Sequence, residues 1–299
     1  MAIAACRGSD GADAVDLYPD PDRPLLVAAI EAAGADAAPV SWDDEDVDWR
    51  RFDLTVIRST WDSVDRPQEY LGWARAASRS TTVMNPVAAI EWNIDKGYLR
   101  ALRSRGIAVA PTQWVVEEGP WEPPEYEFVV KPATSGGGRE TTRYHPDDAH
   151  AAAAHVRRLL GAGRTVMVQP YIGSVDTDGE AKLVFIEGEF SHAVRVGPLL
   201  VAGEGVPERP WEKAVPMDSM TPTSAQLDAA YDVLAAVSAE LRLTLLYARV
   251  DLVTAQTGQP LLAEVELIDP SLLLRLDPPS AGRLAAAIVA NARRGMRHT

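Results

Sequence analysis

Cysteine and long hydrophobic runs are scarce in this sequence, and each absence excludes a class of protein. The single cysteine, Cys6, excludes an intramolecular disulfide framework. The N-terminus has no basic segment followed by a long apolar run, so it does not predict a secretory signal. No apolar stretch reaches the ~20 residues that a membrane-spanning helix needs. We therefore expect a soluble, cytoplasmic protein.

Basic residues are also scarce, with 29 Lys and Arg against 43 Asp and Glu and a formal net charge of −14. A field of this sign repels nucleic acid and anionic membranes, so an anionic substrate would need a locally positive site. No basic stripe with aromatic residues indicates a nucleic-acid module. The five histidines show no spacing typical of a metal site.

The rest of the composition is that of a globular protein, and the first part of the chain predicts a small α/β domain. Of its 299 residues, 46% are hydrophobic, which is enough for two or three cores. Apolar runs at residues 2–6, 37–40 and 52–57 predict strands, and the pattern at 24–34 predicts a helix. This order is typical of a small parallel sheet.

Arg58 follows the strand predicted at residues 52–57, in the place where open α/β sheets gather their ligands. Its guanidinium could hold a substrate carboxylate in a forked contact. An ion pair with Asp62 or Asp65 is an equally good interpretation of the same residue.

A hairpin is predicted at residues 246–267, with its turn at 256–259. Side chains alternate between the two faces of a strand, and the polar ones recur at every second position. If the two polar faces coincide, three carboxylates and a guanidinium share one surface, which suits magnesium. The alternative is a hairpin with a solvated polar face. The side chains that share a face are Tyr247, Arg249, Asp251 and Val253 in the first strand, and Leu262, Glu264 and Glu266 in the second.

A glycine-rich loop follows the strand predicted at residues 126–131, which ends on Lys131. Glycine lets backbone N–H groups approach phosphates closely, and a lysine supplies the point charge that phosphates attract. The spacing fits neither a Walker loop nor a dinucleotide-binding loop, and a flexible hairpin tip is the alternative. Lys96 lies on a helix predicted at residues 88–106, and it becomes a candidate to bind phosphate only if it lies beside such a loop.

Two further segments have a predicted role. The strand at residues 165–169 runs into Pro170, Tyr171 and Ile172, and a crossing of this kind can offer free backbone groups to an adenine ring. Residues 198–216 form a long loop with two glycines, which is typical of an active-site lid.

Taken in order, these features resemble the ATP-grasp superfamily of carboxylate–amine ligases. The resemblance covers the whole chain: Lys96, Lys131, the glycine-rich loop, the VQPYI crossing, then R-V-D and E-V-E. It implies an α/β fold of α+β lobes with ATP between them, behind a small parallel-sheet N-terminal domain. The implied domains are residues 1–87, 88–170 and 171–299.

The resemblance also implies the cofactors, ATP and Mg²⁺, and the residues that bind them. The family usually has asparagine where this chain has Glu266, which leaves open whether Glu266 binds metal or only orients it. For the ribose, Asp178 is the rival of Asp176. The implied nucleotide residues are Lys96 and Lys131 at the phosphates, Ser135, Gly136, Gly137 and Gly138 over them, Gln169, Tyr171 and Ile172 at the adenine, and Asp176 at the ribose. The implied metal ligands are Asp251, Glu264 and Glu266.

In the implied reaction, ATP phosphorylates a substrate carboxylate and an amine nitrogen then attacks the acyl phosphate. Arg249 and Lys131 would stabilise the charge that develops, so their alanine variants should fold normally but lose about 100- to 1000-fold in turnover. Arg249 could instead pair only with Asp251. Ser271 could bind substrate or cap a helix.

A narrower resemblance concerns the phrases RSTWD, NPVAAIEWNIDKGYLRAL and EVELIDPSLLL. They resemble an actinobacterial ATP-grasp subgroup that includes the cyclo-ligase closing O-ureido-D-serine into D-cycloserine, an antibiotic. The alternatives are a ligase that joins two separate amino acids or peptides, and a non-catalytic ATP-binding regulator. The expected partner is a small amino-acid-like substrate, with no nucleic acid and no membrane. Assembly into a homo-oligomer stays open.

Overall fold

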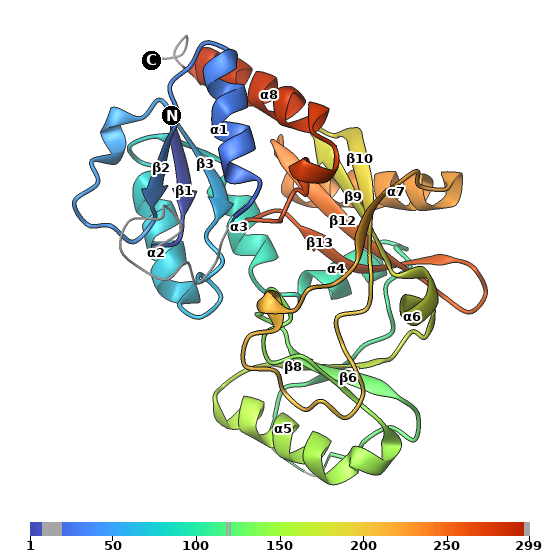
Figure 1. Ribbon diagram of the computed structural model, residues 1–299. Helices are drawn as coiled ribbons and strands as arrows, with labels where there is room; N and C mark the ends of the chain where they lie inside the picture. The colour runs from blue at the N-terminus through green and yellow to red at the C-terminus, as the bar shows by residue number, and fades with distance from the viewer. Residues whose placement is uncertain (8–19, 118, 120, 296–299) are drawn as a thin grey trace.

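Three β-sheets with helices packed against them make up the protein (Figure 1). The computed structural model describes residues 1–7, 20–117, 119 and 121–295. The strand orders are β2-β1-β3-β4, β5-β8-β6-β7 and β11-β10-β9-β12-β13. No helix of the described part is both long and apolar enough to cross a membrane.

The N-terminal sheet is parallel throughout, as its sequence pattern predicts. Its two central strands, β1 and β3, are buried along their whole length, which is why they read as continuous apolar runs. The helix α1 has a proline in its first turn and is followed by Gly34 at φ +83°. The elements are β1 (Ala2–Ala5), α1 (Arg23–Ala32), β2 (Ala38–Ser41), β3 (Leu54–Ser59), α2 (Pro67–Ala77) and β4 (Thr82–Met84).

The central lobe is an antiparallel sheet backed by one helix, at the bottom of Figure 1. Phe128 and Val130 of β6 pack with Val166 and Val168 of β8 against α5. Because faces alternate along a strand, Lys131 lies on the opposite face. The elements are β5 (Gln113–Val115), β6 (Phe128–Pro132), β7 (Thr142–Tyr144), α5 (Ala149–Gly161) and β8 (Val166–Pro170).

The C-terminal lobe is an antiparallel sheet with two hairpins, one of them the hairpin predicted at residues 246–267. The helix α7 begins with a capping box, in which the Thr223 hydroxyl accepts from the Gln226 N–H at 3.2 Å. The elements are α6 (Ser174–Asp178), β9 (Glu180–Ile186), β10 (Glu189–Val196), β11 (Met217–Met220), α7 (Ser224–Leu241), β12 (Tyr247–Thr254), β13 (Pro260–Glu266) and α8 (Pro279–Gly295).

The single helix predicted at residues 88–106 is two helices, α3 (Val87–Asn93) and α4 (Tyr98–Ser104). An Asp95 carboxylate oxygen accepts from the Gly97 N–H at 2.8 Å, and the Lys96 N–H donates to the Ala133 carbonyl at 3.0 Å. These local bonds compete with the helical ladder. Lys96 therefore sits at a break between helices, not on a helix as predicted.

Hydrophobic packing crosses the predicted domain limits, which stay a prediction. Ile3 and Leu26 of the N-terminal domain share a core with Val184, Leu246 and Leu284 of the C-terminal lobe. The helices α3 and α4 also pack with that lobe. The central lobe has a core of its own beside α5, but Met167 and Ala133 join the core of the C-terminal lobe.

Candidate active site

The pairing of β12 with β13 brings four charged side chains onto one face. Arg249 lies opposite Glu266, and Asp251 opposite Glu264. Directly opposed residues of antiparallel strands point to the same side, so the shared polar face that the sequence predicts is confirmed for these four.

Leu262 does not share that face, contrary to the prediction. The register shifts after Asp251, so that Leu252 pairs with Leu262 and one extra residue, Ala263, bulges out. The extra residue inverts the alternation, and Leu262 joins the hydrophobic core with Leu252. Sequence alternation alone cannot locate such a bulge.

Arg249 links the two strands through its guanidinium. Its Nε and Nη2 donate to the two carboxylate oxygens of Asp251 at 2.8 Å each, and Nη2 also lies 2.5 Å from Glu266 Oε1. Its Nη1 donates to the Ser271 carbonyl at 3.0 Å. The pairing with Asp251 that was the alternative role of Arg249 is therefore present in the structure.

Lys182 is a charged member of this face that the sequence analysis missed. It stands opposite Asp251 on β9, and its Nζ lies 2.7 Å from Asp251 Oδ2 and 3.3 Å from Glu180 Oε2. The order of strands in a sheet is not readable from one sequence. A lysine inside the otherwise apolar run AKLVFI was the available signal.

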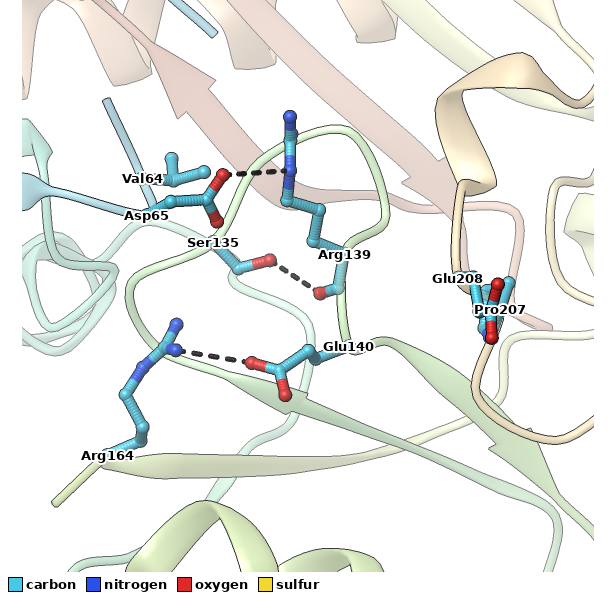
Figure 2. A pocket seen from close by; sticks show the side chains of 8 residues that line it. All are labelled: Val64, Asp65, Ser135, Arg139, Glu140, Arg164, Pro207 and Glu208. Carbon is cyan, nitrogen blue, oxygen red and sulfur yellow. Dashed lines mark hydrogen bonds and ion pairs between the residues drawn. The ribbon is translucent and has the colours of Figure 1, made fainter. Parts of the chain in front are cut away.

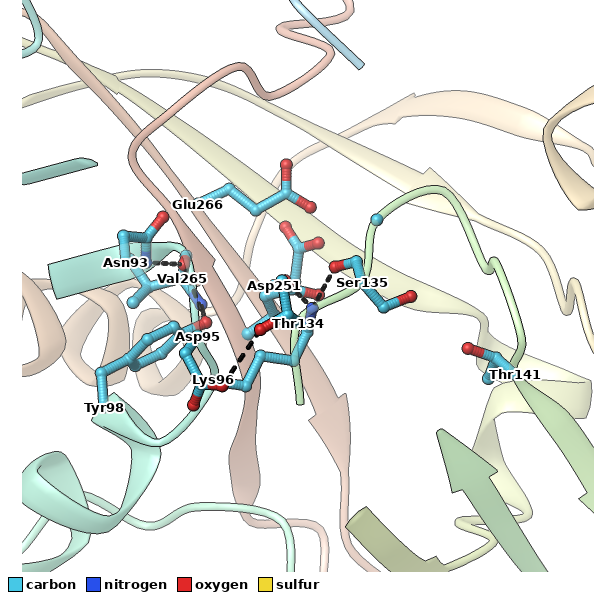
Figure 3. Close-up of polar contacts among 12 residues, drawn as sticks. Asn93, Asp95, Lys96, Tyr98, Thr134, Ser135, Thr141, Asp251, Val265 and Glu266 are labelled. Atoms are coloured by element: carbon cyan, nitrogen blue, oxygen red, sulfur yellow. Dashed lines mark hydrogen bonds and ion pairs between the residues drawn. The ribbon is translucent and has the colours of Figure 1, made fainter. Parts of the chain in front are cut away.

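Lys96 ties the glycine-rich loop to the acidic strands. Its Nζ lies 3.0 Å from Glu264 Oε1 and donates to the Ser135 carbonyl at 2.5 Å. Figure 3 shows Lys96 reaching toward Ser135, with Asp251 and Glu266 on the neighbouring strands. Burial lowers the pKa of Lys131, with Glu264 opposing and Lys96 adding to the shift. The predicted phosphate residues and carboxylates thus meet in one place.

The carboxylates differ in their electrostatic state. Burial alone would raise the pKa of Asp251, but the charges of Arg249 and Lys182 lower it to about 2. Burial raises the pKa of Glu266 to about 7. The charge of Arg249 lowers this pKa, but it does not offset burial together with the negative charges of Glu264 and Asp251.

These oxygen donors fit Mg²⁺ as one or two ligands and do not form a ready-made cage. Within the described ranges, no three acidic, histidine or cysteine side chains are grouped as a metal site. Asp251, Glu264 and Glu266 each contact a cation instead. Mg²⁺ commonly takes only one or two protein carboxylates and completes its shell with water and nucleotide phosphates. The donor set therefore suits a metal that arrives with a nucleotide.

The glycine-rich loop lies between the N-terminal domain and the long loop at residues 198–216. A Cβ on Gly138, at φ +75°, would stand 2.6 Å from Leu199 Cδ2, and one on Gly136 would stand 3.4 Å from Val64 Cγ1. Figure 2 shows the pocket of about 210 Å³ beside this loop. Its walls are Val64, Asp65, Ser135, Arg139, Glu140, Arg164, Pro207 and Glu208. The long loop thus contributes to the pocket, as a lid would.

The backbone at the predicted adenine crossing is less free than expected. The Tyr171 N–H donates to the Glu127 carbonyl at 2.8 Å, and the Ile172 carbonyl accepts from the Val175 N–H at 3.0 Å. The first bond extends the β6–β8 ladder, and the second lies at the beginning of α6. Gln169 donates through Nε2 to the Thr112 hydroxyl at 2.8 Å.

Asp176, the predicted ribose residue, is held by two neighbours. Its Oδ1 accepts from the Tyr171 hydroxyl at 2.6 Å and from Arg143 Nη1 at 3.0 Å. The Arg143 guanidinium also stacks 3.4 Å from the Tyr171 ring centre. No interaction recorded for the described residues joins Asp176 to the carboxylates of β12 and β13, so its role remains a prediction.

Of the two predicted substrate residues, Arg58 of β3 contacts the segment after β13 and Ser271 lies in that segment. Arg58 is fully buried, donates to the Pro270 carbonyl at 2.8 Å and lies 3.8 Å from Asp20 Oδ2. The alternative ion pairs with Asp62 and Asp65 are not recorded for it. Ser271 precedes no helix directly, so the capping role is wrong. Contact of either residue with substrate stays a prediction.

Comparison with known proteins finds the same name by family model, by sequence and by structure. Residues 1–85 match the family model described as D-cycloserine synthetase DcsG, N-terminal domain. The cycloserine biosynthesis protein DcsG of Streptomyces lavendulae is 36% identical over 292 residues, covering 92% of this chain and 95% of that protein. The crystal structure of D-cycloserine synthetase DcsG superposes with a TM-score of 0.85 at 33% identity, covering 98% of this chain and 99% of that one.

More distant structures share the fold. A RimK domain ATP-grasp protein from Sphaerobacter thermophilus has a TM-score of 0.64 at 20% identity, covering 96% of this chain and 99% of that one. D-alanine–D-alanine ligase from Bacillus anthracis has a TM-score of 0.66 at 11% identity, covering 100% and 99%. The predicted ATP-grasp fold is confirmed.

Proposed function

The chain belongs to the D-cycloserine synthetase DcsG family of ATP-grasp ligases, and on this premise we propose that it closes O-ureido-D-serine into D-cycloserine. It is an ATP-dependent ligase. The relative's name supplies the product, and the substrate is the acid whose own nitrogen can close that ring.

The proposed reaction has two covalent steps. A carboxylate oxygen attacks the γ-phosphorus of ATP, so that an acyl phosphate forms and ADP leaves. The ureido nitrogen that is bonded to oxygen then attacks the acyl carbon and displaces phosphate. The carbamoyl group must also leave, and water can remove it as carbon dioxide and ammonia. An enclosed site protects the acyl phosphate from hydrolysis.

The observation that carries this proposal is the convergence of cations and carboxylates on adjoining strands. Lys96 and Lys131 are suited to the phosphates, with Ser135 and the three glycines beside them. Arg249, already anchored at Ser271, is suited to the acyl phosphate and to the oxyanion that follows it. Gln169, Tyr171, Ile172 and Asp176 are the proposed nucleoside contacts.

We also propose Mg²⁺ as a cofactor, held by Asp251 and Glu264, with Glu266 as a third oxygen donor or as their support. When bound, the metal supplies positive charge to the phosphates. Chelation should abolish ADP release, and added Mg²⁺ should restore it. Full ADP release in excess chelator would contradict this cofactor.

ADP release from ATP with O-ureido-D-serine, and no other amine, tests the cyclisation. We expect one ADP per D-cycloserine, identified by mass spectrometry. A requirement for a second amino acid would instead support a ligase that joins two molecules. Tight ATP binding without turnover on any acid would support a regulator.

A further inference from the structure

Side-chain hydrogen bonds hold the backbone carbonyls of the segment that follows β13. Residues 268–271 each present a backbone oxygen to a different side chain. Two of the four donors come from the end of β3 and the residues after it, and two come from β12. The bonds run from the Tyr247 hydroxyl to Ile268 at 2.6 Å, Trp61 Nε1 to Asp269 at 2.8 Å, Arg58 Nη1 to Pro270 at 2.8 Å and Arg249 Nη1 to Ser271 at 3.0 Å.

This anchorage sets the position of one carboxylate, that of Asp269. Its Oδ2 accepts from the Thr60 hydroxyl at 2.8 Å, and that hydroxyl lies 3.0 Å from the Tyr70 hydroxyl. A hydroxyl has one proton, so Tyr70 donates to Thr60 when Thr60 donates to Asp269. Across the described ranges, Oδ1 has no recorded hydrogen-bond donor.

Asp269 also differs from the surrounding carboxylates, because no ion pair is recorded for it among the described residues. No lysine or arginine nitrogen of the described residues is recorded within 4.0 Å of it. Burial, with the charge of Asp62, raises its pKa to about 6, although Thr60, Arg58 and Arg139 act to lower it. The neighbouring carboxylates have cations: Asp62 pairs with Arg66, Asp65 with Arg139, Asp251 with Arg249 and Lys182, Glu264 with Lys96, and Glu266 with Arg249.

A partly buried carboxylate without a cation is unfavourable unless a ligand supplies the charge. The substrate of the proposed function carries such a charge, an α-ammonium group one carbon away from the carboxylate that is activated. Arg249, bonded two residues along at Ser271, is the cation suited to that carboxylate.

We propose that Asp269 binds the α-ammonium group of the substrate and so selects α-amino acids over acids that lack it. The inference rests on the proposed function and adds the residue that recognises the amine. Thr60 acts as a positioning residue for the Asp269 carboxylate.

The test compares O-ureido-D-serine with the same acid lacking its α-amino group, by ADP release. Wild-type enzyme should prefer the amino acid by about 10- to 100-fold in kcat/KM, as expected for one charge-assisted contact. Asp269→Asn should abolish this preference by raising KM for the amino acid, with KM for ATP unchanged. Asp269→Glu should keep part of the preference.

Thr60→Val is the matched control, because it removes a bond to the same carboxylate but leaves the charge. It should keep most of the preference for the amino acid and lose only the part that depends on the position of the carboxylate. Equal use of the two acids by wild-type enzyme would overturn the inference without any variant. So would an unchanged preference in Asp269→Asn, or, if that variant does not fold, full preference in Asp269→Ser.

Failure of the proposed substrate is distinguishable from failure of this inference. If wild-type enzyme releases no ADP with O-ureido-D-serine, the cyclisation proposal fails. The comparison is then made with the amino acid that supports ADP release in a screen, and with its counterpart lacking the amine. A preference that disappears in Asp269→Asn still supports the subsite, and one that persists overturns it.

Discussion

Lys131 and Arg249 are both enclosed cations, but their surroundings differ. Arg249 pairs with Asp251 and Glu266. For Lys131 no ion pair is recorded among the described residues, and burial lowers its pKa. The expectation that both alanine variants fold normally therefore needs revision for Arg249.

Replacing Lys131 with methionine should separate stability from activity. The change removes a partly buried charge that has no recorded ion pair among the described residues, and it keeps the volume, so the free energy of unfolding in urea should stay the same or rise. ADP release should fall about 100- to 1000-fold, because the phosphates lose a cation. Near-normal turnover would refute the role of Lys131.

Replacing Arg249 with alanine should, in contrast, lower the free energy of unfolding by about 3–5 kcal/mol. The reason is that Asp251 and Glu266 would be left without their shared cation in a buried place. Urea unfolding of this variant beside Lys131→Met makes the comparison. Equal stability of the two variants would show that the carboxylates do not depend on Arg249.

His155 gives a prediction on pH. It is 2% exposed, contacts the Tyr144 hydroxyl at 3.0 Å, and burial lowers its pKa from 6.5 to about 4. The unfolded chain binds a proton below pH 6.5 and the folded chain only near pH 4, so stability is lost as the pH falls through this window. The loss attributable to His155 is about 3 kcal/mol. Unfolding curves should show it, and His155→Gln should flatten the dependence.

The sequence predicted the polar residues of one hairpin but not their partners from elsewhere. Arg249, Asp251, Glu264 and Glu266 follow from alternation within two strands that are adjacent in the chain. The contact of Lys182 with Asp251 could be predicted only by knowing that β9 lies beside β12. The surroundings of Asp269 could be predicted only by knowing its contacts with the N-terminal domain. Long-range pairing of this kind is decided by tertiary packing and leaves no local pattern.

At the scale of elements, the outer edge of β13 is covered near its C-terminal end by side chains, and at Leu262 by an isolated parallel bridge to Val109. Asn85 donates to the Leu267 carbonyl at 2.7 Å, Asn93 donates to Val265 at 2.8 Å, and the Tyr98 hydroxyl donates to Val265 at 2.9 Å. Unpaired edges need such protection. The segment at residues 85–99 thus holds in place the strand that carries Glu264 and Glu266.

Asn93→Ala should therefore destabilise the protein by about 3 kcal/mol. It leaves the buried Val265 carbonyl without one donor and the Leu267 N–H without its acceptor. Asn291→Ala is the matched control, because Asn291 is half-exposed. It donates to the carboxylate of Glu187, which is exposed to solvent, and to the Ala287 carbonyl of its own helix. The control should change the free energy of unfolding by less than about 0.5 kcal/mol. Equal effects would contradict a structural role for the edge cover.

The break between α3 and α4 shows why element boundaries escaped prediction there. The apolar spacing of residues 88–106 continues through the break, because both helices face the same core. The hydrogen bonds of Asp95 and Lys96, one of them to Ala133 just after β6, interrupt the helical ladder. Hydrophobic periodicity records which face is buried and not whether the backbone ladder is continuous.

At the scale of the whole molecule, the hydrophobic cores divide the chain into unequal parts. The N-terminal sheet and the C-terminal lobe share one core, and α1 packs beside α8 (Figure 1). The central lobe keeps a separate core between its sheet and α5. The two parts meet at apolar contacts, where Met167 and Ala133 join the C-terminal core, and at a polar contact, where Lys96 Nζ donates to the Ser135 carbonyl.

Calorimetry should therefore show two unfolding transitions without nucleotide, with the central lobe melting first. A ligand that bridges both parts stabilises them together in proportion to its binding free energy. Mg²⁺ with a non-hydrolysable ATP analogue should move the lower transition toward the upper one, because the proposed phosphate residues lie on both parts. Lys131→Met weakens the binding on the central lobe only, so in that variant the two transitions should stay apart. A single two-state transition without nucleotide would show that the separate core does not unfold independently.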